Sequence, residues 1–174
     1  MAIQPYHSIK KGAKMKKNIA VYPGTFDPIT NGHIDLVERS LGIFDEVIIA
    51  LAPNPKKIPL FTIEERIEMI KAATKGLENV KTDVFNGLLV NYAKKKKAKA
   101  IIRGLRAVSD FEYEFQMALM NRRLDSMIET VFLMPSEEYS YLTSTIIKEI
   151  AAFKGSVKGL VPKIVEDKLK EKFV

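Results

Sequence analysis

Cysteine and tryptophan are absent from this chain of 174 residues, and histidine occurs only twice, at His7 and His33. The lack of cysteine excludes disulfides, thiolate catalysis and cysteine-based zinc sites, and two histidines provide little for a histidine-based metal cluster. No apolar run approaches the ~18 residues that span a membrane, and the N-terminus lacks the apolar segment of a secretory signal. The sequence therefore predicts a cytoplasmic protein without a membrane segment.

The chain is 47% hydrophobic and 28% charged, which is typical of one globular domain. Its net charge of +7 suggests a nucleic-acid partner at first sight, but five lysines and no acidic residue lie within the first 17 residues. The segment 1–14 has no apolar period, so we expect an expression leader or disordered extension there and a single domain over 15–174. We therefore expect no nucleic acid as a partner.

A second basic run covers Lys94 to Lys97, where the pattern predicts the end of a helix. Lysines in the last turn of a helix complement the helix dipole, so a structural role is the better interpretation of this run. A non-catalytic nucleic-acid-binding domain, using this run and the N-terminal lysines, stays the alternative from another functional class.

Strand-like and helix-like patterns alternate along the chain. They predict strands near 18–22, 46–51, 79–84, 99–103 and 129–134, and helices near 31–43, 62–75, 87–97, 109–124, 143–153 and 162–172. Such alternation is typical of an α/β fold with a doubly wound, parallel, five-stranded sheet, here with helices on both faces and a C-terminal helix. Ligands of such a sheet bind at the carboxyl ends of its strands.

The segment from Tyr22 to His33, YPGTFDPITNGH, joins the first predicted strand to the first predicted helix. Gly24 permits close backbone approach, Thr25 adds a hydroxyl, and His33 lies where a helix begins with its N–H groups facing outward. We expect an anion to bind there. An ordinary βα connection with His33 on the surface is the simpler alternative.

Three motifs resemble those of a known enzyme family. Thr30-x-Gly32-His33 has the form of the (H/T)xGH signature of the nucleotidyltransferases, and the surrounding YPGTFDPITNGH resembles the phosphopantetheine adenylyltransferases. The stretch IRGLRAVSDFEYE, which begins at Ile102, is similar to the second motif of that family. Leu142-Thr143-Ser144-Thr145-x-x-Lys148 is similar to the ISSTxx(R/K) element and keeps its hydroxyls. The resemblance extends from about Lys16 to the C-terminus.

The resemblance implies a Rossmann-like nucleotidyltransferase that transfers the adenylyl group of ATP to 4′-phosphopantetheine. It makes His33 the stabiliser of the transition state. It assigns the acceptor to Thr25, Lys57, Leu89 and Arg103, with Lys56 as a competitor for the role of Lys57. The implied ATP-binding residues are Thr25, Phe26, His33, Gly104, Leu105, Arg106, Glu114, Tyr139, Ser140, Tyr141, Leu142, Thr143, Ser144 and Thr145.

The residues themselves support part of this assignment. Arg103 emerges from an apolar strand, and a guanidinium must reach solvent or an anion because it cannot be deprotonated. Three successive hydroxyls at 143–145 exceed what one helix cap needs, so the extra ones suit phosphate. The spacing of the helix at 109–124 predicts a buried face made of Phe111, Phe115, Ala118 and Leu119. Glu114 lies off that face, so without the resemblance it would be interpreted as a solvated glutamate.

The expected chemistry needs few side chains. A phosphate monoester is anionic at neutral pH, so positioning and charge stabilisation suffice, without a covalent intermediate. No cluster of carboxylates marks a metal cage, so we expect Mg²⁺ to bind through the ATP phosphates and assign no metal ligand. The resemblance further implies a homohexamer and coenzyme A as a feedback ligand. An enzyme of the same fold with a nicotinamide mononucleotide, glycerol phosphate or flavin acceptor is the nearest rival, but the IRGLRA segment and the short chain favour pantetheine.

Overall fold

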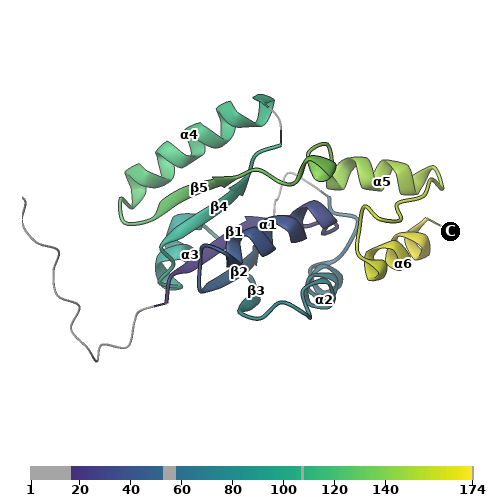
Figure 1. Cartoon of the computed structure of the whole chain (residues 1–174), viewed down its shortest axis with the longest axis horizontal. Coiled ribbons are helices and arrows are strands. Elements are labelled where there is room, and N and C mark those ends of the chain that lie inside the picture. Colours follow the sequence, from purple (N-terminus) through teal and green to yellow (C-terminus); the bar gives the residue numbers. More distant parts are fainter. Residues whose placement is uncertain (1–16, 53–57, 107, 174) are drawn as a thin grey trace, which may run out of the picture.

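The computed structural model describes residues 17–52, 58–106 and 108–173 (Figure 1). Its centre is a five-stranded sheet in the order β3-β2-β1-β4-β5, in which all paired strands run parallel. The strands are β1 (Ile19–Gly24), β2 (Glu46–Leu51), β3 (Val80–Val84), β4 (Ala100–Gly104) and β5 (Glu129–Leu133). The predicted fold class is confirmed, and each predicted strand agrees with an observed one to within two residues. The predicted leader at 1–14 lies outside the described residues.

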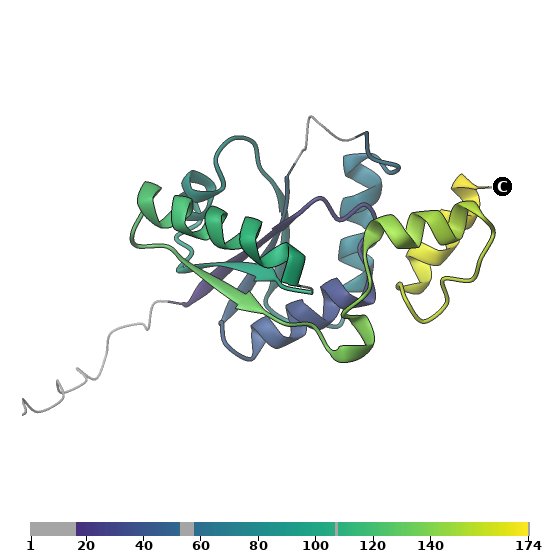
Figure 2. The same cartoon turned by 90° about the horizontal axis from the view of Figure 1, so that it is seen from above.

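Six α-helices and one turn of 3-10 helix surround this sheet within the described residues. They are α1 (Asn31–Leu41), α2 (Ile63–Ala73), α3 (Leu89–Lys95), α4 (Val108–Leu124), η1 (Glu137–Tyr139), α5 (Ser144–Ala152) and α6 (Lys163–Lys172). Figure 1 places α4 along β4 and β5, and Figure 2 shows α5 and α6 side by side beyond the end of the sheet, next to the C-terminus. No described helix is long and apolar enough to cross a bilayer.

The two central strands are buried because their side chains meet a hydrophobic layer on each face of the sheet. All six residues of β2 are buried, and β1 is buried from Ala20 to Pro23. Alternate residues serve opposite layers: Ala20 and Tyr22 join the layer that includes α1 and α6, whereas Val21 joins the one that includes α3. This pattern is that of a doubly wound sheet, in which near-continuous apolar strands are covered on both sides.

One prediction about α4 is wrong. Phe111, Phe115 and Leu119 do not form a buried face, because they are 45%, 45% and 49% exposed. Phe111 stacks on Phe115 and touches Phe132 of β5, but these contacts leave much of both rings open. Helical spacing identified the apolar side chains of α4 correctly but could not reveal that the folded chain leaves them uncovered.

The basic run at the end of α3 has the structural role that the sequence favoured. Lys94 forms an ion pair with Asp125 at 3.0 Å, and Lys96 forms one with Asp83 at 2.6 Å. Lys94 and Lys95 lie in the last turn of the helix, where positive charge is favourable.

Candidate active site

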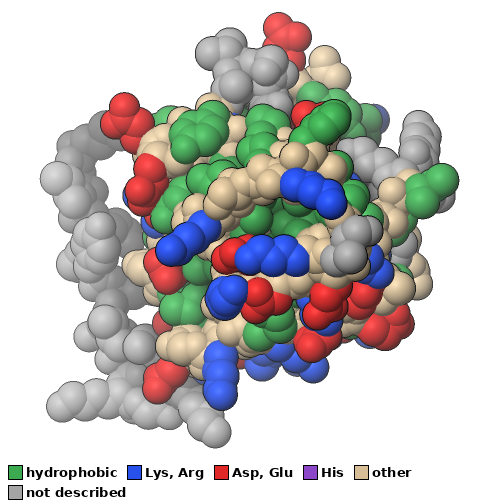
Figure 3. Space-filling model, turned by 90° about the vertical axis from the view of Figure 1, so that its right-hand side faces the viewer, with side chains coloured by type: hydrophobic (Ala, Val, Ile, Leu, Met, Phe, Trp, Pro, Cys, Tyr) green, Lys and Arg blue, Asp and Glu red, His purple; other side chains and the backbone are tan. Residues whose placement is uncertain are grey.

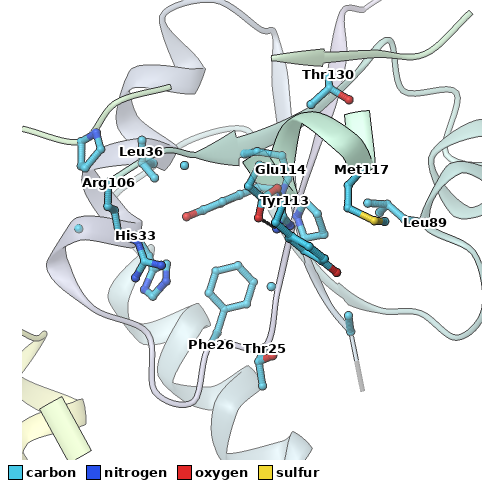
Figure 4. A pocket seen from close by; sticks show the side chains of 18 of the residues that line it. Thr25, Phe26, His33, Leu36, Leu89, Arg106, Tyr113, Glu114, Met117 and Thr130 are labelled. Atoms are coloured by element: carbon cyan, nitrogen blue, oxygen red, sulfur yellow. Dashed lines mark hydrogen bonds and ion pairs between the residues drawn. The ribbon is translucent and has the colours of Figure 1, made fainter. Parts of the chain in front are cut away.

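A cleft of about 630 Å³ opens at the carboxyl ends of β1 and β4, where the strand order reverses (Figure 4). This is the place where an open α/β sheet binds its ligand. The first turn, α1, α4 and the loop after β5 supply its walls. The lining includes Tyr22, Gly24, Thr25, Phe26, Thr30, Gly32, His33, Leu89, Arg103, Gly104, Arg106, Tyr113, Glu114, Met117, Asn121, Thr130, Tyr139 and Leu142.

The first turn is folded tightly over the end of β1. Phe26 has a positive φ of 47° and places its ring back over Gly24, where an added Cβ would lie 2.8 Å from the ring. The packing of the Phe26 ring against the backbone therefore requires glycine at position 24. The ring of Phe26 is 3% exposed and meets the His33 ring edge-on, with centroids 5.2 Å apart. Phe26 thus packs beside the catalytic candidate (Figure 4).

His33 is the third residue of α1 and completes its capping box. Thr30 is the N-cap, and its hydroxyl accepts a hydrogen bond from the His33 backbone N–H. In return the Thr30 backbone N–H donates to Nδ1 of His33 at 3.0 Å, and the Thr30 hydroxyl lies 2.9 Å from the same nitrogen. Because Nδ1 accepts, the neutral ring carries its hydrogen on Nε2. His33 therefore presents Nε2–H as a donor.

The ring of His33 is held neutral. Burial, followed by the nearby cation of Arg106, lowers the pKa of His33 from 6.5 to about 4. Figure 4 shows Arg106 and His33 next to each other at one side of the cleft. A neutral Nε2–H can stabilise developing negative charge by hydrogen bonding, but it has no proton to give away at neutral pH. This arrangement suits an electrostatic stabiliser and not a general acid.

Asp27 ties the first turn to two other parts of the chain. Its carboxylate is 5% exposed and accepts hydrogen bonds from the backbone N–H groups of Leu60 and Phe61, at 3.0 and 2.9 Å. Lys148 of α5 donates to the same carboxylate at 2.7 Å. Burial acts to raise the pKa of Asp27, but the hydrogen bonds from Lys148, Leu60 and Phe61 bring it below the usual 3.8. The lysine of the third motif therefore binds Asp27 in this structure.

Arg103 reaches the cleft as predicted, and it also has a partner there. Its Nε donates to Oε2 of Glu114 at 2.6 Å, and its Nη2 donates to Oε1. The Glu114 side chain is 13% exposed. Its place off the apolar face suggested a solvated glutamate, but it is the ion-pair partner of Arg103. A guanidinium has five N–H donors, so Arg103 keeps donors for a phosphate while it is paired with Glu114.

Gly104 and Arg106 also line the cleft, whereas Leu105 does not. Leu105 donates its N–H to Leu133 O at 3.0 Å and so extends the pairing of β4 with β5. An added Cβ at Gly104 would lie 2.5 Å from Cδ1 of Leu36 in α1. Glycine at 104 is thus needed for close packing of helix on strand, in addition to any approach of a ligand.

The loop from 136 to 145 reaches the cleft only in part. Tyr139 and Leu142 line it, but Ser140, Tyr141, Thr143, Ser144 and Thr145 do not. The Thr143 hydroxyl caps α5 by accepting from Ile146 N, and the Ser144 hydroxyl donates to Pro28 O at 2.8 Å. Thr143 is therefore the cap, and Ser144, one of the two hydroxyls beyond the need of a cap, has a structural partner.

The 136–145 loop packs closely against α1 at Gly32. An added Cβ there would lie 3.2 Å from Cβ of Tyr139, so the small residue of the first motif admits the tyrosine. Asp35 holds the start of the same loop, since its carboxylate accepts from the N–H and the hydroxyl of Ser136, at 2.8 and 2.7 Å. The loop is therefore fixed on the first two turns of α1.

Of the four predicted acceptor residues, Thr25, Leu89 and Arg103 line the cleft together. Lys57 and its competitor Lys56 lie outside the described residues. Several further lining residues were not predicted, among them Tyr22, Tyr113, Met117, Asn121 and Thr130. A polar residue after an apolar run marks one of them in the sequence, Asn121 within its helix, whereas Tyr22 in its apolar strand resembles a core residue.

Comparison with known proteins agrees with this geometry. Residues 21–150 match the family model described as cytidylyltransferase-like. The chain is 64% identical over 154 residues to the phosphopantetheine adenylyltransferase of Thermodesulfovibrio yellowstonii, a match that covers 88% of this chain and 96% of the relative. The chain belongs to the phosphopantetheine adenylyltransferase family. A relative of the same name from Caldanaerobacter subterraneus is 57% identical over 155 residues, or 89% of this chain and 97% of the relative.

A solved structure shows the same fold outside this family. The Vibrio parahaemolyticus protein assigned as a nicotinate-nucleotide adenylyltransferase superposes with a TM-score of 0.69 at 20% identity, over 89% of this chain and 99% of that one. At that identity the likeness concerns the fold alone. The phosphopantetheine adenylyltransferase assignment therefore comes from the close relatives and from the motifs, which the structure gathers around one cleft.

Proposed function

We propose that this chain transfers the adenylyl group of ATP to 4′-phosphopantetheine, which gives dephospho-coenzyme A and pyrophosphate in coenzyme A biosynthesis. The observation that supports it most is the neutral His33, oriented by Thr30 beside Arg106 and set in a cleft that Arg103 also enters. Positively charged and neutral donors around one space suit a reaction between two phosphates.

The acceptor phosphate attacks the α-phosphorus of ATP in line, a new P–O bond forms, and the bond to pyrophosphate breaks. Thr25 and Arg103 hold the attacking phosphate, and Nε2–H of His33 donates to an α-phosphate oxygen as charge develops there. Arg106 takes a nucleotide phosphate on the other side. No proton needs to be removed from the nucleophile, because a phosphate monoester is ionised near neutral pH.

The part of the cleft away from His33 suits the pantetheine arm. Leu89 and Met117 lie close together there (Figure 4) and offer apolar contact. Asn121 is 7% exposed and lines the same cleft, and Thr130 Oγ1 is buried without a hydrogen-bond partner among the described residues. A ligand with amide and hydroxyl groups along an aliphatic chain would satisfy these polar atoms while filling the apolar wall.

Mg²⁺ would enter this site on the nucleotide. The described lining contains one carboxylate, Glu114, and it is paired with Arg103. The described residues hold no group of three or more acidic or histidine side chains able to form a metal cage. This donor set fits a cation whose ligands are phosphate oxygens and water, and the bound ion would neutralise polyphosphate charge.

An assay of ATP with 4′-phosphopantetheine tests the proposal, with nicotinamide mononucleotide, glycerol 3-phosphate and flavin mononucleotide as competing acceptors. We expect pyrophosphate and dephospho-coenzyme A only with the first acceptor. Turnover of a rival acceptor at a higher kcat/KM would show that the acceptor has been assigned wrongly.

We further propose that the chain forms a homo-oligomer through α4, consistent with the homohexamer that the resemblance implies. The exposed apolar residues of this helix include Phe111, Phe115, Leu119, Met120 and Leu124, at 45–53% exposure. Exposed apolar patches of this kind mark association surfaces. Light scattering of the full chain and of Phe115→Glu tests it: we expect an oligomer for the first and a smaller species for the second.

Coenzyme A as a feedback ligand and a cytoplasmic location also belong to the proposal, because coenzyme A carries the arm for which the cleft is suited and the reaction uses cytoplasmic metabolites. Competition titration with coenzyme A tests the first, and cell fractionation tests the second.

The surface does not favour the nucleic-acid alternative. On the face seen in Figure 3, basic and acidic side chains are interspersed and form no continuous basic patch.

A further inference from the structure

Tyr22 carries a polar group to which neither the motifs nor the mechanism gives a role. It is the fourth residue of β1, is 5% exposed and lines the cleft. Its hydroxyl makes no hydrogen bond with any residue that the structure describes. A buried phenol hydroxyl ordinarily has a partner, because leaving one unpaired costs free energy. A phenol that lines a ligand cleft without a protein partner is therefore placed to bind the ligand.

The position of Tyr22 is defined by contacts on three sides. Its ring meets Phe26 edge-on, with centroids 5.4 Å apart at 78°, and the His33 centroid is 6.4 Å away. An added Cβ at Gly104 would lie 4.0 Å from Tyr22 Oη, so the hydroxyl lies beside the end of β4. It therefore reaches the gap between the first turn and β4, where the two reacting phosphates meet in the proposed mechanism.

Burial keeps this hydroxyl protonated. Burial raises the pKa of Tyr22 above its usual value of 10.0, although the cations of Arg103 and Arg106 act to lower it. The phenol is neutral at physiological pH and always has a hydrogen to donate. These two arginines, which line the cleft together with Tyr22, are the ones assigned to the acceptor and to the nucleotide.

We propose that Tyr22 is a further catalytic residue, whose Oη–H donates a hydrogen bond to a non-bridging oxygen of the α-phosphoryl group during transfer. This inference rests on the proposed adenylyl transfer and deepens it. No proton is transferred, and the hydrogen bond strengthens as charge accumulates on that oxygen. Tyr22 and His33 then form a pair of neutral donors between two arginines, which stabilises the transition state without holding either substrate more tightly.

Tyr22→Phe tests the proposal because it removes the hydroxyl and keeps the ring contact with Phe26. We expect kcat to fall about tenfold or more, the scale of one lost hydrogen bond to a charged group, while the KM values for both substrates change less than about threefold. The thermal midpoint of the unliganded protein should stay the same, since the hydroxyl makes no hydrogen bond with the residues that the structure describes.

Tyr92→Phe is the matched control. Tyr92 is also buried, but its hydroxyl donates to Asp83 Oδ2 at 2.9 Å and it does not line the cleft. We expect this variant to lose thermal stability and keep its turnover, the opposite of Tyr22→Phe. A kcat of Tyr22→Phe within about twofold of an active parent would overturn the inference, as would a fall in kcat that accompanies a lower melting temperature. Lack of turnover in the parent itself would instead refute the proposed function.

Discussion

The backbone N–H of Thr30 donates to Nδ1 of His33 across 3.0 Å, so the residue that caps α1 also orients the ring that lines the cleft. In an ordinary capping box a glutamate or glutamine occupies the third helical position. Here a histidine does, and the spacing from Thr30 to His33 is the spacing of the box. The first motif is thus a helix cap whose third helical residue is the proposed catalytic histidine.

The tautomer and charge of His33 can be measured directly. Because Nδ1 accepts and the pKa lies near 4, we expect nitrogen NMR to show Nε2–H and a neutral ring from pH 5 to 8. Arg106→Ala should raise the pKa, since the cation contributes to the shift after burial. A ring that titrates near 6.5, or that carries its hydrogen on Nδ1, would contradict the assigned role.

The lowered pKa of His33 also makes the stability of the fold depend on pH. A histidine whose pKa is lower in the folded state binds fewer protons there than in the unfolded chain between pH 4 and 6.5. His33 therefore contributes no penalty above pH 6.5 and a growing one as the pH falls toward 4.

Thr30→Ala tests whether the N-cap of α1 affects turnover as well as stability. We expect a loss of about 1 kcal/mol in unfolding free energy, as for other N-cap residues, and a lower kcat because Nδ1 of His33 loses one of its two contacts with Thr30. Thr62→Ala is the control, since Thr62 forms the same capping box with Glu65 at the start of α2, away from the cleft. Urea denaturation should show similar losses for both variants, and only Thr30→Ala should lower turnover. Equal turnover in the two would mean that the cap does not position the ring.

Asp27→Asn should destabilise the fold and change its response to acid. The variant keeps the shape of the carboxylate but loses the charge that binds Lys148 and both backbone donors, a loss we place at roughly 1.5–3 kcal/mol. The pKa of Asp27 is lowered in the folded state, so its contribution is present above pH 4 and disappears as the pH falls through the folded value.

Chemical denaturation between pH 7 and pH 3 measures both effects. The parent should lose stability over the acid part of that range, and Asp27→Asn should lose less. Asp167→Asn provides the comparison, because Asp167 and its partner Lys163 are 50% and 72% exposed and such a pair contributes little. An acid response of Asp27→Asn identical to that of the parent would remove Asp27 as its cause.

The two arginines of β4 and the following loop should differ in the ligand that they bind. Replacing Arg103 by leucine should weaken 4′-phosphopantetheine binding while ATP binding persists, and Arg106→Ala should weaken ATP. Each lost charge-assisted contact is worth roughly 1.5–3 kcal/mol, or about tenfold to 150-fold in affinity. Calorimetric titration with each ligand separately decides it. Equal weakening of both ligands by both variants would show that the two arginines do not divide the cleft between the two ligands.

The sequence predicted the sheet, the order of elements and the place of the cleft because these depend on local signals. Alternating apolar periods locate strands and helices, and the ends of parallel strands must meet at one edge. It did not predict the partners of polar side chains. Glu114 looked solvated and is paired with Arg103, while the Ser144 hydroxyl donates to a carbonyl 116 residues away. Such contacts depend on tertiary distances that the sequence pattern does not contain.

The α4 prediction was wrong for a related reason. An apolar stripe on a helix indicates that the helix packs against another apolar surface. The sequence alone does not show whether that surface belongs to the same chain. Phe111, Phe115 and Leu119 carry the stripe, and the folded chain leaves them about half exposed. Tyr22 was not predicted as a site residue, because a tyrosine in an apolar strand resembles a core residue until the cleft beside it is known.

The turnover of His33→Ala tests the central claim most directly. The variant should fold with a helical content equal to that of the parent and bind ATP with little loss, because His33 is assigned to charge that develops only during transfer. Formation of dephospho-coenzyme A from saturating ATP and 4′-phosphopantetheine should fall on the order of 10²-fold or more, the scale for removing one preorganised donor. A kcat within about threefold of the parent would contradict the account and make His33 a structural residue of the α1 cap.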